Sequence, residues 1–162
     1  MLDKFTWGGQ QISAQWFDIL NDKIPDISPA KWQGVKIIAN ENGQLVLCRN
    51  PGNPNGYYEL PGGHYEDYDH NVETTIFREF DEETNGEIID WWPIGYQICT
   101  YESGHSDYQL RVFANAKNTS RHINDPGGEI TSTELVSLVD FSKYIKWGAI
   151  GERILSRVKG EF

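Results

Sequence analysis

ELPGGHYEDYDHNVETTIFREFDEETNG, residues 59–86, is the stretch that decides the fold of this chain. Its second half predicts a helix from Asn71 to Thr84, with Asn71 as the N-cap and Glu73 placed favourably in the first turn. Asn85 and Gly86 predict the end of that helix, because both residue types tolerate the left-handed backbone conformation of a C-cap. The Gly62-Gly63 pair predicts a tight turn before the helix.

Three glutamates of this helix share one face. Glu79, Glu82 and Glu83 are related by i, i+3 and i+4, so their carboxylates crowd together and repel one another. The apolar residues of the helix, which would pack on a sheet, lie about a quarter turn away; they are Val72, Ile76, Phe77 and Phe80. Hard divalent cations remove such repulsion, and Mg²⁺ prefers oxygen ligands. Taken alone, the same spacing also fits a solvated acidic helix face.

The segment resembles the Nudix box, whose pattern is G-x5-E-x7-R-E-U-x-E-E-x-G-U, with U a bulky apolar residue. The matching residues of the second half are Arg78, Glu79, Phe80, Glu82 and Glu83. Residues 59–63 are also similar to the strand-to-loop entry of that family.

The resemblance is broken at two positions. Counted from Gly63, the expected loop glutamate is Asp69, and eight residues instead of seven separate it from Arg78. At the other end, Asn85 replaces the glycine of the pattern and Gly86 stands where an apolar residue is expected. Neither departure touches the metal-binding glutamates, and asparagine also adopts positive φ.

The resemblance implies an α/β fold, the Nudix-type α/β/α sandwich with a mixed β-sheet between helices. It implies that Glu82 and Glu83 bind Mg²⁺, with Mn²⁺ as an alternative, and that Glu79 is a further ligand or the base that activates water. The carbonyl of Gly62 is a further expected ligand. Arg78 is expected to be structural, bridging to loop acids such as Asp69 or Glu66.

Three more residues are weaker candidates. A later acid often completes the site in the family, and Glu129 and Glu134 are the two candidates, although each also fits an ordinary surface position. Arg49, at the end of a strand beside the loop, is a candidate phosphate contact, with a surface salt bridge as the alternative. Trp91, Trp92, Tyr57 and Tyr58 offer rings for a base, but packing is the commoner role of such aromatics.

The implied reaction is cleavage of the diphosphate linkage of a nucleoside diphosphate joined to another group. A nucleoside triphosphate, a nucleotide sugar, ADP-ribose and a dinucleotide all remain open as substrates. A nucleotide-metabolite sensor of the same fold without turnover is the main alternative. A third reading is a diphosphate isomerase, which needs a suitably placed cysteine. The family resemblance also suggests a homodimer.

The flanking sequence predicts the rest of the sheet. Residues 35–39 and 44–49 are expected to form a hairpin, and residues 57–60, 87–101, 109–116 and 134–139 further strands. Residues 1–30 are difficult to interpret; Ile12, Trp16, Phe17 and Leu20 suggest one face of a short helix starting near Ser13. From Ser142 onward, one apolar stripe predicts a helix; it contains Trp147, Ile150, Ile154, Leu155 and Val158.

Length and composition limit the function classes. The 162 residues suit a single domain, residues 1–162, and the net charge of −10 disfavours long nucleic acids as partners. A small anion chelated by a metal ion fits this charge better. Cys48 and Cys99 lie in apolar strands and are expected to be buried thiols. Neither a signal peptide nor a membrane span is predicted, so a cytoplasmic location is the default expectation.

Overall fold

The computed structural model describes residues 1–7, 9–27, 31–53, 56–123 and 125–162. Its strands are β1 (Leu2–Trp7), β2 (Gln10–Asp18), β3 (Trp32–Glu41), β4 (Gln44–Arg49), β5 (Tyr58–Glu59), β6 (Glu87–Tyr101), β7 (Ser106–Lys117) and β8 (Ser132–Val136). Its helices are α1 (Val72–Thr84), the 3₁₀ turn η2 (Leu138–Asp140), α2 (Phe141–Tyr144) and α3 (Gly148–Val158).

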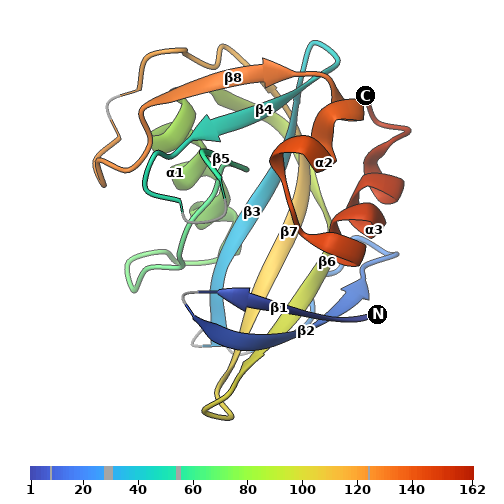
Figure 1. The fold of residues 1–162 in the computed structure, drawn as a ribbon. Coiled ribbons are helices and arrows are strands. Elements are labelled where there is room, and N and C mark those ends of the chain that lie inside the picture. Colours follow the sequence, from blue (N-terminus) through green and yellow to red (C-terminus); the bar gives the residue numbers. More distant parts are fainter. Residues whose placement is uncertain (8, 28–30, 54–55, 124) are drawn as a thin grey trace.

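The strands form one mixed sheet in the order β1-β2-β6-β7-β3-β4-β5, with β8 paired to β4. The central pair β3–β7 is parallel, and the other pairs are antiparallel. Helix α1 covers one face, whereas α2 and α3 lie on the other (Figure 1). The expected α/β/α arrangement, a mixed sheet between helices, is therefore confirmed.

Each face of the sheet has its own apolar core. Ile76 and Phe80 of α1 pack on one face with residues of β3 and β7, and Ile150 and Ile154 of α3 belong to the cluster on the other. The prediction for Phe77 was wrong, because this ring is 42% exposed and the neighbouring Thr75 is buried instead. Cys48 and Cys99 are buried free thiols, as expected.

The N-terminal segment is a hairpin, and the expectation of a helix near Ser13 was wrong. Strand β2 buries Ile12, Ala14 and Trp16 in strict alternation, whereas Leu20 is 77% exposed. A spacing of i and i+4 occurs on one face of a helix and equally on one face of a strand. Pairing of β2 with β6 places Trp16 opposite Gln97 and adds β2 and β1 to the edge of the sheet.

The C-terminal part differs from its prediction in detail. Strand β8 ends at Val136, and residues 138–140 form a 3₁₀ turn rather than the end of a strand. The apolar stripe from Trp147 to Val158 does lie on a helix, α3, which α2 precedes as one separate turn. Among the described helices, none is long and apolar enough to cross a membrane.

The sheet opens beside β3, and this opening positions the glycine loop. Strand β4 pairs with β3 only at Asn40 and Glu41. Along the first half of β3 the loop takes the place of a strand: the Ile37 N–H donates to the Pro61 carbonyl (2.8 Å), and the Val35 N–H donates to the Gly63 carbonyl (3.0 Å). The loop that precedes α1 is thereby fixed at the centre of the sheet.

Candidate active site

Gly62 and Gly63 lie where no side chain fits. Gly62 has φ of 120°, and a Cβ atom there would lie 2.4 Å from the Val35 carbonyl oxygen. A Cβ atom on Gly63 would lie 2.4 Å from Glu79 Oε2. Real non-bonded atoms do not approach so closely, so the two glycines allow the backbone to enter the gap between β3 and α1. The Gly63 backbone and the Glu79 carboxylate are consequently brought into contact.

Glu83 is anchored at this turn. Its Oε2 atom accepts a hydrogen bond from the Gly62 N–H at 2.7 Å, and the thiol of Cys48 lies 3.9 Å from the same oxygen. Burial raises the pKa of Glu83 to about 8, although the charge of Lys36 and the Gly62 N–H oppose that rise. A carboxyl held neutral in this way gains strongly from any cation that enters.

Glu79 and Glu82 lie on the same side of α1, and Arg78 connects them. Arg78 Nη1 donates to Glu79 Oε1 at 2.8 Å and to Glu82 Oε2 at 3.2 Å. Glu79 is buried, and burial raises its pKa against the lowering effect of Arg78. The Glu82 side chain is 35% exposed, so it is the carboxylate of the three that solvent reaches most easily.

Arg78 also fixes the loop, through Asp69. Its Nε and Nη2 donate to the two oxygens of Asp69 at 3.0 and 2.7 Å, and Nη2 also donates to the His64 carbonyl. This bidentate pair is the main reason that the pKa of Asp69 is lowered to about 2. The bridge between Arg78 and Asp69 expected from the sequence is present; Glu66 contributes its backbone N–H, which donates to Asp69.

The network explains how the loop tolerates its departure from the box pattern. Asp69 also accepts a hydrogen bond from the Thr75 hydroxyl at 2.9 Å, and its carbonyl accepts one from Tyr65. Both oxygens of this shorter acid are therefore used in contacts with the loop and α1. At the other end of the helix, Asn85 has φ of 50°, the left-handed conformation expected for a C-cap.

Lys36 is a residue of this site that the sequence interpretation missed. It lies on β3, and its ammonium donates a hydrogen bond to the Gly62 carbonyl. The charge of Lys36 lowers the pKa of both Glu79 and Glu83. The signal available in the sequence was a single charged residue inside the apolar run from Val35 to Ala39. The structure thus places a cation of the chain on the carbonyl expected to bind metal.

The oxygen donors fit a hard divalent cation by their chemistry. Carboxylates of Glu79, Glu82 and Glu83 and the Gly62 carbonyl are the donor types that Mg²⁺ takes. In the described part of the chain, no three His, Cys, Asp or Glu side chains already surround one point. Cations of the chain already contact several of these oxygens: Arg78 contacts Glu79 and Glu82, and Lys36 contacts the Gly62 carbonyl.

The weaker candidates lie outside the hydrogen-bond network of the three glutamates, although β8, which carries Glu134, lies beside α1. Glu134, on β8, accepts a hydrogen bond from the Tyr58 hydroxyl at 2.9 Å, and Glu129 is exposed after its turn. Arg49 is exposed at the end of β4, with Tyr58 as its partner on β5. Within the described residues, no hydrogen bond or ion pair joins any of these three side chains to Glu79, Glu82 or Glu83.

Two aromatic candidates for base stacking are already engaged. The Tyr58 ring packs edge-to-face on Tyr144 with centroids 5.0 Å apart, and Trp92 packs on Phe113 at 4.7 Å. Trp91 donates to Glu73 in the first turn of α1. An open depression of about 590 Å³ is lined by Asp22 and residues 91–93. Trp91 in its wall contacts Glu73, which lies roughly 15 Å along α1 from Glu83 at 1.5 Å per residue. Tyr57 is 62% exposed.

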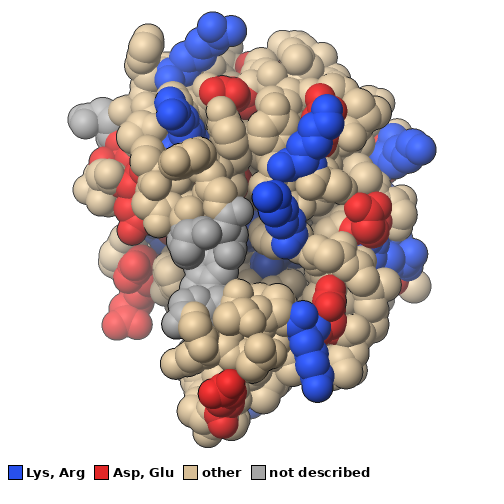
Figure 2. Space-filling model, viewed as in Figure 1, with Lys and Arg blue, Asp and Glu red and all other residues tan. Residues whose placement is uncertain are grey.

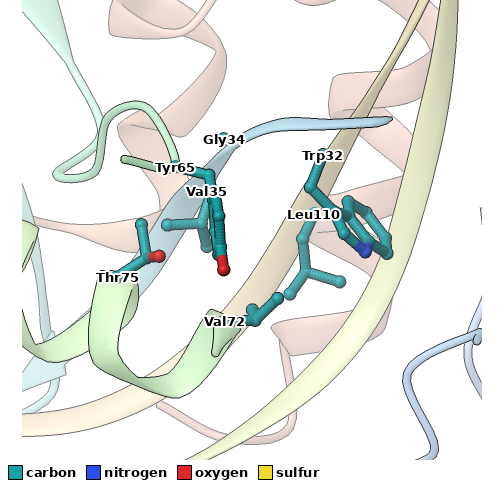
Figure 3. A pocket seen from close by; sticks show the side chains of 7 residues that line it. All are labelled: Trp32, Gly34, Val35, Tyr65, Val72, Thr75 and Leu110. Atoms are coloured by element: carbon teal, nitrogen blue, oxygen red, sulfur yellow. The ribbon is translucent and has the colours of Figure 1, made fainter. Parts of the chain in front are cut away.

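A second cavity lies behind the loop and is too small for a substrate. It has a volume of about 10 Å³ and is lined by Trp32, Gly34, Val35, Tyr65, Val72, Thr75 and Leu110. Figure 3 shows Thr75 and Tyr65 on one side of it and Trp32 and Leu110 on the other. Such a volume holds one water molecule at most. This cavity is packing space behind the Asp69–Arg78 network.

The molecular surface has a hollow on the face seen in Figure 1. Figure 2 shows Lys and Arg side chains along the middle of this face, beside the hollow. The sequence shows only that basic residues are scattered along the chain and that the net charge is −10. Asp and Glu side chains lie among these basic residues, so the charge on this face is mixed.

Comparisons with known proteins identify the family and the fold. The family model described as NUDIX domain matches residues 33–158. No curated protein matches the chain in sequence.

Solved structures with a similar fold cover most of the chain. A variant of the Bacillus subtilis pyrophosphohydrolase BsRppH has 16% identity and a TM-score of 0.71, with 98% of this chain and 97% of that chain covered. A MutT NUDIX hydrolase from Burkholderia pseudomallei has 17% identity and a TM-score of 0.61, with 77% and 95% covered. A C. elegans Ap4A hydrolase has 16% identity and a TM-score of 0.53, with 80% and 99% covered. At these identities the likeness concerns the fold.

Proposed function

Because this chain belongs to the Nudix family, we propose that it is a metal-dependent hydrolase that cleaves the diphosphate linkage of a nucleoside diphosphate derivative. The observation that carries this proposal is the convergence of the Glu79 and Glu83 carboxylates on the Gly62-Gly63 turn. Two of these groups are carboxylates whose pKa burial raises. Buried carboxylates with raised pKa values at one backbone turn are typical of functional sites.

The residues that would hold Mg²⁺ are Glu82, Glu83 and Gly62, with Glu79 as a further ligand or as the base. Bound Mg²⁺ or Mn²⁺ would neutralise the charge on the diphosphate oxygens and acidify a water molecule beside them. A carboxylate with a raised pKa accepts a proton from water more readily, and Glu79 has that property. Proton acceptance by a positioned base contributes about 10²–10⁴-fold to such reactions.

Arg78 has a structural role in this proposal. Its guanidinium is already engaged by Asp69, Glu79, Glu82 and the His64 carbonyl. It is therefore committed to orienting the glutamates and the loop rather than to binding phosphate. Arg49, which is exposed at the end of β4, remains the candidate for contact with a phosphate group of the substrate.

The substrate class follows from the charge and from the relatives in fold. The site suits an anion that brings its own oxygen ligands to the cation, as a diphosphate does. One structural neighbour is named a pyrophosphohydrolase and another an Ap4A hydrolase. We propose a nucleoside diphosphate linked to a phosphate, a nucleotide, a sugar or a ribose as the substrate of this chain, with residues 1–162 acting as one domain.

A panel of nucleotide derivatives tests this proposal. The full chain is incubated with each compound and Mg²⁺, and release of inorganic phosphate, pyrophosphate or nucleoside monophosphate is measured. The proposal expects turnover of at least one class, and loss of that turnover with a chelator. Tight binding without turnover across the panel would contradict the hydrolase and favour the nucleotide-metabolite sensor. Rearrangement of an isoprenoid diphosphate without cleavage would favour the isomerase, although Cys48 and Cys99 are buried.

A further inference from the structure

Lys36 is a partly buried charged residue in the middle of β3, between two buried apolar neighbours. Its neighbours Val35 and Ile37 are 2% and 0% exposed, and both belong to the core beneath α1. Lys36 points to the opposite face of the sheet, since side chains alternate along a strand. Lysine in such a position normally extends its ammonium to water. Here the ammonium donates to the Gly62 carbonyl instead.

Gly62 connects this ammonium to the glutamate site. Its carbonyl accepts from Lys36, and its N–H donates to Glu83 Oε2 at 2.7 Å. A Cβ atom on Gly62 would lie 3.1 Å from Lys36 Cα, so the glycine backbone packs directly against the strand. The position of the ammonium is consequently set by the same turn that sets the carboxylate.

The charge of Lys36 acts on the glutamates through space. It lowers the pKa of Glu83 and of Glu79, against the effect of burial. Yet no ion pair within 4.0 Å joins Lys36 to a carboxylate in the part of the chain that the structure describes. The ammonium therefore supplies charge to the site while its hydrogen bond goes to a neutral oxygen.

From these contacts we propose that Lys36 is a resident counter-ion, which competes with the divalent cation for the Gly62 carbonyl and thereby sets the metal affinity of the glutamate site. The inference rests on the proposed function, since it concerns the same cation. Lys36 is a positioning residue in this account: it keeps the glutamates close together without metal and must leave the carbonyl when metal binds. Two cations cannot share one carbonyl oxygen without strong repulsion.

Metal binding to variants of the full chain tests the proposal without any substrate. Mn²⁺ binding is followed by EPR for the wild type, Lys36→Met and Lys36→Gln. Protons compete with Mn²⁺ for the glutamates, and the charge of Lys36 opposes the binding of both. The Mn²⁺ affinity is therefore measured at pH 7.5, 8.0 and 8.5 and extrapolated to the pH at which protons no longer compete. Removal of one nearby positive charge should tighten Mn²⁺ binding by about tenfold or more in both variants.

Lys117→Met is the matched control, because it removes the same charge far from the site. Lys117 forms an ion pair with the exposed Glu87. Arg111 on β7 is the register partner of Lys36, and Lys117 lies six residues farther along that strand. The Cα atoms of Lys36 and Lys117 are therefore about 20 Å apart. This variant should keep wild-type affinity within about twofold, since exposed charges at that distance are screened.

Stability and NMR give two further readouts. Without metal, Lys36→Met should melt at a lower temperature than wild type, and saturating Mg²⁺ should raise its Tm by more. In wild-type protein labelled at lysine Cε, Mg²⁺ should shift the Lys36 resonance, which Lys36→Gln identifies by its absence.

The outcomes separate this inference from the proposed function. Wild-type affinity in both Lys36 variants, or an unshifted Lys36 resonance at saturating Mg²⁺, would overturn the counter-ion while leaving the hydrolase intact. Tighter binding by Lys36→Met alone would overturn it too, because Lys36→Gln also lacks the charge. A wild-type chain that binds no divalent cation would remove both proposals.

Discussion

Asp69 and Glu83 are both acidic residues of the loop–helix segment, and they lie in opposite electrostatic environments. The pKa of Asp69 falls to about 2, and that of Glu83 rises to about 8. Asp69 is held bidentately by the guanidinium of Arg78. Among the described residues, the hydrogen-bond partners of the Glu83 carboxylate are the Gly62 N–H and the Cys48 thiol, and the charge of Lys36 acts from farther off. Burial acts on both groups; the cationic partner makes the difference.

This difference separates the segment into a structural half and a reactive half. At the Asp69 end the buried carboxylate has a cationic partner inside the chain, Arg78, and a further hydrogen bond from Thr75, so the loop is held against α1. At the Glu83 end, burial raises the pKa of the carboxyl by more than the nearby positive charge lowers it. A protein that keeps buried carboxylates under-neutralised loses stability there, and binding of a cation recovers it. Substitutions at the two ends should therefore behave differently.

The largest expected effect is on turnover at the reactive end. Glu83→Gln and Glu82→Gln should each lower kcat/KM by roughly 10²-fold or more, since each removes a charged ligand of the proposed cation. The measurement is release of phosphate or nucleoside monophosphate with saturating Mg²⁺. Circular dichroism should show an unchanged fold. Near-normal turnover in both variants would remove the metal assignment.

The next effect is on stability at the structural end. Asp69→Asn should destabilise the fold by about 2 kcal/mol at pH 7, because the pKa of Asp69 is lowered from 3.8 to about 2 by contacts that exist only when folded. Urea unfolding measures this loss. Asp67→Asn, at an exposed position of the same loop, is the control and should change stability by less than about 0.5 kcal/mol.

The pH dependence of that loss has a defined sign. A depressed pKa means that the stabilising contribution of Asp69 is present above about pH 4 and disappears as the pH falls toward 2. Wild type and Asp69→Asn should therefore converge in stability near pH 2. A difference that persists unchanged at pH 2 would show that the variant acts through packing instead.

Glu83→Gln should have the opposite effect on stability when metal is absent. The raised pKa means that wild-type stability is highest below about pH 4.5 and declines as the pH rises toward 8, where Glu83 ionises in the folded state. The variant avoids this cost, so with a chelator at pH 8 it should be more stable by about 1–2 kcal/mol. Thermal melts from pH 5 to 8 measure the gain. Lower stability of the variant at pH 8 would contradict an under-neutralised site.

The smallest expected effect distinguishes Glu134 from Glu129, the two candidates for a further acid of the site. Glu134 is held by Tyr58 on a strand that pairs with β4, whereas Glu129 is exposed in a turn. Glu134→Gln should raise KM by about twofold to fivefold, and Glu129→Gln should change it by less than about twofold. Steady-state kinetics on the best substrate of the panel decide this. The reverse order would assign the later acid to Glu129.

Much of the fold near the helix is determined by local sequence, which is why it was predicted well. Asn71 caps α1 through its side chain, and Asn85 ends it in the left-handed conformation. The i, i+3, i+4 spacing also places Glu79, Glu82 and Glu83 on one side of the helix. These features depend on residues within a few positions of one another, so no knowledge of the tertiary structure is needed.

The missed features depend on distant residues. Ile12 and Trp16 fit a helix or a strand equally, and pairing with β6 selects the strand. The buried Ala14 between the polar Ser13 and Gln15 was the local clue. Lys36 lies on β3, and only the insertion of the loop beside that strand brings Gly62 to its ammonium. Charge inside an apolar strand was the one signal, and it does not identify the partner.

Proton release on metal binding tests the central claim most directly. Wild-type protein is titrated with Mg²⁺ or Mn²⁺ by calorimetry at pH 7 in two buffers that differ in ionisation enthalpy. Because the pKa of Glu83 is about 8, the carboxyl is largely protonated at this pH, and binding should release about one proton. Glu83→Gln should release far less. Binding heat that is independent of the buffer, or no binding at all, would contradict a cation site at Glu83.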